Sequence, residues 1–161
     1  HPKTIQPLQR KSIPLEVKSF INPKKESSII GDYKLVEPFV PSYIVKENQI
    51  LISVSDKNLS FIVEEHLSSI FTLFAKYGVR VNMMQNSAVS FSVCVDYDRH
   101  KIPPLLNCLQ EDFEVHFNEN LTLYTIRHYN EDSMEKLLTN KELVLEQKSR
   151  HTIHLVVKDL E

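Results

Sequence analysis

Glycine is nearly absent from this chain: only Gly31 and Gly78 occur among its 161 residues, against a usual share of roughly 7%. The glycine-rich loops that hold phosphates, such as the P-loop and the dinucleotide-binding fingerprint, need several glycines within a few positions. Neither loop can be assembled from these residues. The sequence therefore predicts that nucleotide chemistry of this kind lies outside the chain.

Cysteine is also scarce. Cys94 and Cys108 are the two cysteines of the chain, too few for a disulfide framework or a four-thiolate metal site. The histidines are scattered, and His151 and His154 stand three positions apart in an expected strand, so they point to opposite faces. We expect no metal site and a reducing, cytoplasmic environment.

Neither sign of charge dominates. Lys plus Arg total 19 and Asp plus Glu 21, for a formal net charge of -2, whereas proteins that bind nucleic-acid phosphates carry a basic excess. No apolar run approaches the roughly 20 residues of a membrane-spanning helix, and no secretory signal opens the chain. We expect a soluble globular protein that binds neither nucleic acid nor membrane.

The chain opens with His1 rather than Met, directly in sequence that looks structured. We expect it to be a piece of a larger protein with the missing part upstream. The nucleotide chemistry that the glycine count excludes here would then belong to that part.

Residues 49–118 carry the pattern of a βαββαβ unit. Alternating apolar residues predict strands, and apolar residues at helical spacing predict helices. Gly78 stands where a glycine commonly ends a helix. The expected strands are 49–55, 79–83, 89–95 and 113–117, and the expected helices are 60–77 and 102–109. This order is that of the ferredoxin-like fold, an antiparallel sheet with two helices on one face.

The pattern then starts again. Strands are expected at 121–126, 143–146 and 152–158, with a helix at 133–140. The strand pair repeats at an offset of 62 residues, so that Gln85 and Ser87 match Gln147 and Ser149. This second unit lacks its last helix and strand, which would leave a sheet edge exposed.

The start of the chain offers the missing pieces in the right order, a helix at 2–11 and a strand at 13–20. We therefore predict an α+β fold of two ferredoxin-like units. The first unit spans 49–118 and is inserted into a discontinuous second unit made of 1–30 plus 119–161. Residues 31–48, which contain Pro38 and Pro41, are predicted to be an irregular connector.

Several stretches resemble aspartate kinases, and the similarity extends over essentially the whole chain. Residues 1–5 (HPKTI), 13–18 (IPLEVK) and 22–23 (NP) resemble the junction after the catalytic domain of these enzymes. Residues 70–95 resemble their first regulatory ACT domain, and 146–150 (EQKSR) fall at the hairpin of the second. The family usually has Gly-Thr after the Asn-Pro turn, where this chain has Ser27 and Ser28.

The resemblance implies the function. Aspartate kinases phosphorylate the side-chain carboxylate of aspartate with ATP, the first step toward lysine, threonine and methionine, and their tandem ACT domains bind an end-product amino acid that inhibits the kinase. The parent protein is thus expected to be an enzyme, with its catalytic residues, ATP and Mg²⁺ in an upstream kinase domain. The fragment itself is expected to be non-catalytic, without a cofactor, and to form a homodimer through its first ACT domain.

The resemblance also implies an effector site for lysine or threonine. A free amino acid needs backbone N–H groups for its carboxylate, best supplied near a helix N-terminus, and oxygen acceptors for its ammonium. The candidate residues are Asp56, Ser60, Glu65, His66, Leu67, Asn82, Gln85, Asn86 and Ser87. Lysine-inhibited members have an aspartate at the position of Asn82, and an amide lacks the negative charge that pairs with a second ammonium.

Other interpretations remain open. Asn86 and Ser87 are also common turn formers, and the chain is also compatible with a stand-alone amino-acid-sensing ACT module. An RNA-binding ferredoxin-like domain needs exposed aromatic side chains on its central strands. Phe91 is the only aromatic residue of its expected strand and shares a face with Val89, Val93 and Val95, which is typical of a core position. A small hydrolase of the acylphosphatase type needs an arginine in its anion-binding loop, and residues 56–60 contain none.

Overall fold

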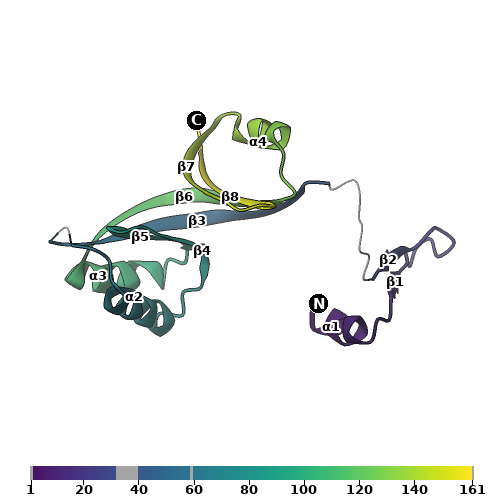
Figure 1. Cartoon of the computed structure of the whole chain (residues 1–161), viewed down its shortest axis with the longest axis horizontal. Coiled ribbons are helices and arrows are strands. Elements are labelled where there is room, and N and C mark those ends of the chain that lie inside the picture. The colour runs from purple at the N-terminus through teal and green to yellow at the C-terminus, as the bar shows by residue number, and fades with distance from the viewer. Residues whose placement is uncertain (1, 32–39, 59, 161) are drawn as a thin grey trace. The chain divides into compact units, whose positions relative to one another are not determined.

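The structure, a computed structural model, describes residues 2–31, 40–58 and 60–160. Contacts divide the chain into two compact units, an N-terminal unit (residues 1–40) and a C-terminal unit (residues 41–161). The first contains a two-stranded sheet and the second a six-stranded sheet (Figure 1).

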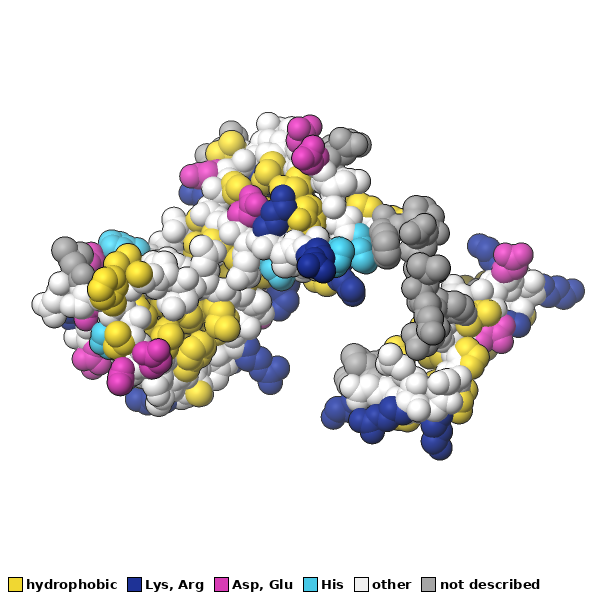
Figure 2. Space-filling model, in the orientation of Figure 1, with side chains coloured by type: hydrophobic (Ala, Val, Ile, Leu, Met, Phe, Trp, Pro, Cys, Tyr) yellow, Lys and Arg dark blue, Asp and Glu magenta, His cyan; other side chains and the backbone are white. Residues whose placement is uncertain are grey.

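The N-terminal unit consists of helix α1 (Pro2–Arg10) and strands β1 (Leu15–Val17) and β2 (Ser28–Ile30). The two strands pair antiparallel, with Leu15 opposite Ile30. None of the described residues of this unit is buried, and apolar side chains lie on its surface (Figure 2). The unit therefore has no hydrophobic core of its own, and chains of this size rarely fold without one.

The C-terminal unit contains three helices and six strands among its described residues. They are β3 (Ser42–Asp56), α2 (Glu64–Lys76), β4 (Val81–Asn86), β5 (Ser90–Asp96), α3 (Ile102–Asp112), β6 (Phe113–Arg127), α4 (Glu131–Leu138), β7 (Lys141–Lys148) and β8 (Thr152–Asp159). The sheet order is β4-β5-β3-β6-β8-β7, and all neighbours are antiparallel. Both predicted ferredoxin-like units lie within this sheet. The first domain, predicted at residues 49–118, uses the order β4-β5-β3-β6, as expected, and the second domain uses the other halves of β3 and β6 with β8 and β7.

Strands β3 and β6 pass through both halves of the sheet. Each is 15 residues long, and Figure 1 shows them side by side. Their pairing shifts register around Gln49, which faces Leu121. Just before these residues, Asn48 and Asn120 have φ values of 53° and 57°, a conformation that asparagine tolerates better than most residues. The strands predicted at 113–117 and 121–126 are therefore one strand with a local irregularity.

The repeat predicted at an offset of 62 residues appears in the backbone. Register shifts fall between Val81 and Met83 in β4 and between Leu143 and Leu145 in β7. The hairpin turns carry the same bond, since Ser87 N donates to Ser90 O and Ser149 N donates to Thr152 O, both at 2.8 Å. Gly78 and Asn140, which follow α2 and α4, have φ values of 62° and 59°.

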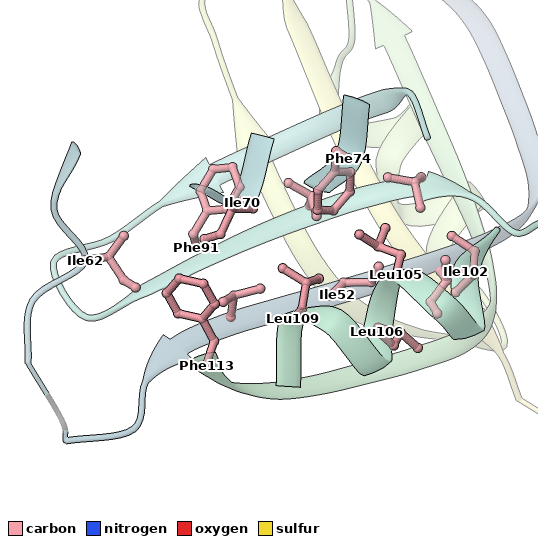
Figure 3. Packing of buried hydrophobic residues seen from close by; sticks show 14 residues of the cluster. Ile52, Ile62, Ile70, Phe74, Phe91, Ile102, Leu105, Leu106, Leu109 and Phe113 are labelled. Atoms are coloured by element: carbon pink, nitrogen blue, oxygen red, sulfur yellow. The ribbon is translucent and has the colours of Figure 1, made fainter. Parts of the chain in front are cut away.

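Helices α2 and α3 cover one face of the first domain and enclose its main core (Figure 3). Ile52 on β3, Phe91 on β5 and Leu105 on α3 are all buried there. In the second domain, α4 packs over a smaller cluster of Ile126, Ile153, Leu155 and Val157. A third cluster joins the two domains on the opposite face of the sheet: Leu51, Met83, Cys94, Leu121, Leu123 and Val156.

One strand assignment is corrected by the structure. The part of β6 in the second domain pairs with β8 on one side and with Ser42–Lys46 of β3 on the other. Residues 13–20 were predicted for this second position, and that prediction is wrong because Leu15–Val17 pairs with Ser28–Ile30 instead. Pro41 directly precedes β3, so it removes no bond from inside the strand.

The predicted connector 31–48 is shortened accordingly. Residues 42–48 belong to β3, whereas 32–39 lie outside the described residues. The second domain is discontinuous because β3 and β6–β8 contribute to it from both sides of the inserted first domain, whereas the prediction gave the part before the insertion to residues 1–30. Membership of residues 1–30 in that domain through helix α1 stays a prediction.

Deleting residues 1–40 is expected to change the melting temperature of the C-terminal unit by less than about 3 °C, a loss of under about 1 kcal/mol. The reason is that the buried hydrophobic residues of the described chain all lie between Ile50 and Val157. Circular dichroism melts of chains 1–161 and 41–161 provide the measurement. A fall of about 10 °C on deletion would instead support the assignment of residues 1–30 to the second domain.

Candidate functional site

The predicted effector residues fall into two groups at the two ends of β4. Asn82 stands near the start of this strand, and Asn86 and Ser87 at its end. Four residues of extended chain, about 13 Å, separate Asn82 from Asn86. The structure therefore separates Asn82 from the other predicted residues.

The first set surrounds the β4–β5 hairpin. Ile62 N donates to Ala88 O at 2.9 Å, which joins the segment before α2 to the hairpin. Asp56 Oδ1 accepts from Asn58 N at 2.7 Å and from Ser60 N at 3.4 Å. Asp56 thus shapes the loop that follows β3, in the manner of an Asx turn, and Ser60 is held by that loop.

The start of α2 is less suited to a carboxylate than the sequence suggested. Its first turn carries Glu64 and Glu65, and negative charge there competes with an anion for the positive end of the helix dipole. His66 Nδ1 accepts from Val63 N at 3.4 Å, and Leu67 N donates to Val63 O at 3.1 Å. The N-cap residue Val63 offers no side-chain hydrogen bond to the first N–H groups of the helix. The two glutamates, rather than a lack of N–H donors, therefore count against a carboxylate at this position.

The hairpin residues have clear structural roles. Ser87 Oγ donates to Ser90 O at 3.1 Å and lies 2.9 Å from Ser90 Oγ. Gln85 and Asn86 are exposed on β4, which is an edge strand of the sheet. Ser87 therefore closes the turn, while Gln85 and Asn86 remain accessible to a ligand or a partner.

Asn82, alone of the predicted residues, belongs to a second set that we call the polar junction: Lys46, Gln49, Asn82 and Asp96. Asn82 Nδ2 donates to Gln49 Oε1 at 2.8 Å and to Asp96 Oδ1 at 2.9 Å. Gln49 Nε2 also donates to Asp96 Oδ1, at 2.8 Å. Lys46 Nζ donates to Asn82 Oδ1 at 2.7 Å and lies 3.8 Å from Asp96 Oδ1.

These contacts use all the hydrogen-bond donors of the Asn82 side chain and its oxygen. Both of its amide hydrogens are donated within the protein, and its oxygen accepts from the ammonium of Lys46. The amide of Gln49 above all, with Asn82 and Lys46, holds the pKa of Asp96 below its usual range. The chain's own ammonium therefore sits on the oxygen that was predicted to receive the ammonium of an effector.

Sequence reasoning missed three members of the polar junction. Gln49 is the one buried polar residue among those that the structure describes, and it directly precedes the hydrophobic run of β3. The repeat holds a further signal, because apolar residues occupy the places in the second domain that match Asn82 and Gln49. Val144 matches Asn82, and Leu121 follows Asn120 as Gln49 follows Asn48. The second domain therefore lacks the two amide side chains at the centre of the polar junction.

Cys94 borders the polar junction. Its Sγ lies 3.7 Å from Gln49 Oε1, and the residue is only 1% exposed. Burial raises the pKa of the Cys94 thiol to about 12. Because the thiolate is the reactive form, Cys94 is inert at neutral pH and serves as a packing residue.

The described part of the chain has neither a cluster of metal-ligand side chains nor a helix that could span a membrane. It contains no cluster of three His, Cys, Asp or Glu side chains that could hold a metal ion. His154 Nδ1 lies 2.9 Å from Thr125 Oγ1, while the ring of His151 lies 6.2 Å from that of His128. No helix within residues 2–31, 40–58 and 60–160 has the length and apolar character to cross a membrane.

Known proteins resemble this chain in sequence and in fold. No family model matches the chain. Over 119 residues it is 26% identical to chloroplastic aspartokinase 1 of Arabidopsis thaliana, covering 71% of this chain and 21% of that protein. A candidate C-terminal regulatory domain of aspartate kinase from Porphyromonas gingivalis matches with a TM-score of 0.60 at 19% identity, covering 74% of this chain and 86% of that one. The chain has the fold of aspartokinase regulatory regions.

Longer aspartokinase structures match as well. Aspartokinase III of E. coli, in complex with lysine and aspartate, has a TM-score of 0.72 at 20% identity, covering 98% of this chain and 38% of that one. Aspartate kinase of Clostridium acetobutylicum has a TM-score of 0.81 at 16% identity, covering 98% and 41%. The predicted resemblance and ACT-type fold are confirmed. The chain spans about a fifth of the curated aspartokinase and about two fifths of these two structures.

Proposed function

We propose that the chain is the regulatory region of an aspartate kinase, which binds an end-product amino acid and transmits feedback inhibition. The observation that carries the proposal is the pair of ACT-type domains, one inserted into the other, in the same fold as aspartokinase structures. ATP-dependent phosphorylation of aspartate, with ATP and Mg²⁺, would belong to a catalytic domain of the whole protein. E. coli aspartokinase III, with which the chain shares its fold, was solved with lysine and aspartate bound.

The N-terminal unit supports attachment to such a domain. The two kinase structures cover 98% of the chain, whereas the candidate regulatory domain covers 74%, about the share that the C-terminal unit represents. The unit also exposes Phe20 and Ile21 almost completely, at 100% and 96%. A cavity of about 510 Å³, lined in part by Ile5, Leu8 and Ile30, opens in it. We propose that the catalytic domain covers these apolar surfaces.

Inhibition would require the effector to bind one arrangement of the protein better than another, because equal affinity shifts nothing. A coupling free energy of about 1–3 kcal/mol is sufficient. The first domain presents β4 as an edge strand, and unpaired edges favour pairing with another chain. We therefore propose a homodimer through the first domain, with the effector near the hairpin of β4 and β5.

Of lysine and threonine, the polar junction favours threonine. Lys46 already supplies an ammonium to Asn82 Oδ1 at 2.7 Å, so a lysine effector that used this oxygen would have to displace it. The side chain of threonine carries no ammonium, so it does not have to displace Lys46. The side-chain amide of Asn82 carries no negative charge to pair with a lysine ammonium, which also favours threonine.

The proposal is tested by thermal-shift screening of chain 1–161 with L-lysine, L-threonine and L-methionine. A ligand at 100 times its dissociation constant stabilises by about 2.7 kcal/mol, so the effector is expected to raise the melting temperature by several degrees. The matching D-amino acid serves as the control. Equal responses to both enantiomers, or no response to any of the three L-amino acids, would contradict the proposal.

A further inference from the structure

A polar pocket of about 410 Å³ opens in the first domain, away from the hairpin. One side comes from the segment that enters β4 and the other from the segment between β5 and α3. The lining residues are Gly78, Val79, Arg80, Asp96, Tyr97, Asp98 and Lys101. The pocket thus lies at the opposite end of β4 from Asn86 and Ser87, and none of the predicted effector residues lines it.

The pocket carries charges of both signs, and one of its cations is unused. Lys101 Nζ lies 3.8 Å from Asp98 Oδ2 and 3.4 Å from Gly78 O. Arg80 is exposed and has no hydrogen-bond or ion-pair partner among the residues that the structure describes. A guanidinium with all its donors available is suited to hold a carboxylate through two parallel hydrogen bonds.

The pocket also offers an anionic acceptor. The contacts described for Asp96 all end on its Oδ1, which leaves Oδ2 for a further donor. Asp98 Oδ1 accepts from His100 N at 2.8 Å. The two carboxylates in the lining would repel a phosphate or another multiply charged anion, and Arg80 and Lys101 would repel a simple cation. The lining therefore favours a ligand that carries one positive and one negative charge.

We propose that this pocket binds a small zwitterion of the α-amino-acid class, with its carboxylate on Arg80 and its ammonium on Asp96. The neighbouring start of α3 does not provide an alternative anion site. Pro103 and Pro104 have no N–H to donate, and Ile102 N donates to Asp98 O at 2.9 Å. The proposal does not depend on the proposed function, because it rests on the lining of the pocket alone.

Asp96 belongs both to the pocket and to the polar junction, so it connects the pocket to the rest of the sheet. The same residue accepts from Gln49 and Asn82 in the polar junction and lies 3.8 Å from Lys46. Lys46 belongs to the part of β3 that pairs with β6 in the second domain. An ammonium held by Asp96 would weaken the attraction of Asp96 for Lys46. Ligand binding in the pocket is therefore expected to change the contacts of Lys46, where the two domains meet.

The test is an amide chemical-shift titration of chain 1–161 with L-alanine, L-threonine and L-lysine. The signals of Gly78, Arg80, Tyr97 and Lys101 are expected to move for at least one of them. Acetate and methylamine, which carry one charge each, are expected to move them far less at the same concentration. Arg80→Gln should weaken binding about tenfold or more, as expected for loss of a charge-assisted pair. Arg99→Gln, an exposed neighbour outside the lining, should leave the dissociation constant within about twofold.

The possible outcomes separate the two proposals. Shifts confined to Ser60–Leu67 and Asn86–Ser87, with normal binding by Arg80→Gln, would overturn the pocket and leave the proposed function standing. Shifts at the pocket with acetate alone would show an anion site and overturn the zwitterion. No shift with any amino acid would overturn the pocket. If Arg80→Gln does not fold, the shift map of the unaltered chain with its one-charge controls decides the matter.

Discussion

Replacing Leu105 by alanine is expected to lower the free energy of unfolding of the C-terminal unit by about 2–5 kcal/mol. Leu105 lies on α3 with none of its surface exposed, and it points into the cluster that α2, α3 and the sheet enclose (Figure 3). Truncation removes apolar contacts and leaves a cavity that rigid neighbours such as Ile52 fill only in part. Urea denaturation followed by circular dichroism measures the change.

Leu160→Ala is the matched control. Leu160 is 57% exposed, so the same truncation there is expected to change stability by less than about 0.5 kcal/mol. Its backbone bond to Asn140 O does not involve the side chain. Equal losses in the two variants would mean that the face covered by α3 is not the principal core of the first domain.

The second large effect is expected at Gln49. Gln49→Ala should destabilise the C-terminal unit by about 2–4 kcal/mol, because it combines a buried cavity with the loss of a hydrogen-bond network. Gln49 Oε1 accepts from Asn82, and its Nε2 donates to Asp96 and to Glu47 O. Denaturant unfolding of the variant provides the measurement.

Gln49→Leu separates the two causes. Leucine is the residue that faces Gln49 at position 121, and it fills most of the volume while removing every hydrogen bond. Asn82 and Asp96 are less buried than Gln49 and can turn to water, so we expect a loss of about half that of the alanine variant. Gln85→Ala, on an exposed glutamine of β4, is the control and should stay within about 0.5 kcal/mol. A Gln49→Ala variant as mild as this control would show that the network adds nothing to stability.

Most elements of the C-terminal unit were predictable from local patterns. The helix before Gly78 and the strands around the Gln85–Ser87 turn follow from apolar periodicity and turn residues, which act over a few positions. The offset of 62 was visible because both hairpins must bury the same alternate positions. The extent of β3 was not predicted, since two prolines made residues 31–48 look like a connector. Only its pairing with β6 makes Ser42–Lys46 a strand.

The residues of the candidate site were even harder to predict from local patterns than the strands. The predicted residues were chosen as neighbours of turns, but register places Asn82 beside Lys46, Gln49 and Asp96, far from the hairpin. Arg80 and Asp98 likewise come from segments that are unremarkable when read singly.

By itself the sequence determined the kinds of element, their order and the repeat, because each depends on side chains close together along the chain. The tertiary structure alone decided which strand lies beside β6 and which charges share a pocket. These depend on pairing between residues tens of positions apart, where a shift of one residue would place every side chain on the other face of the sheet.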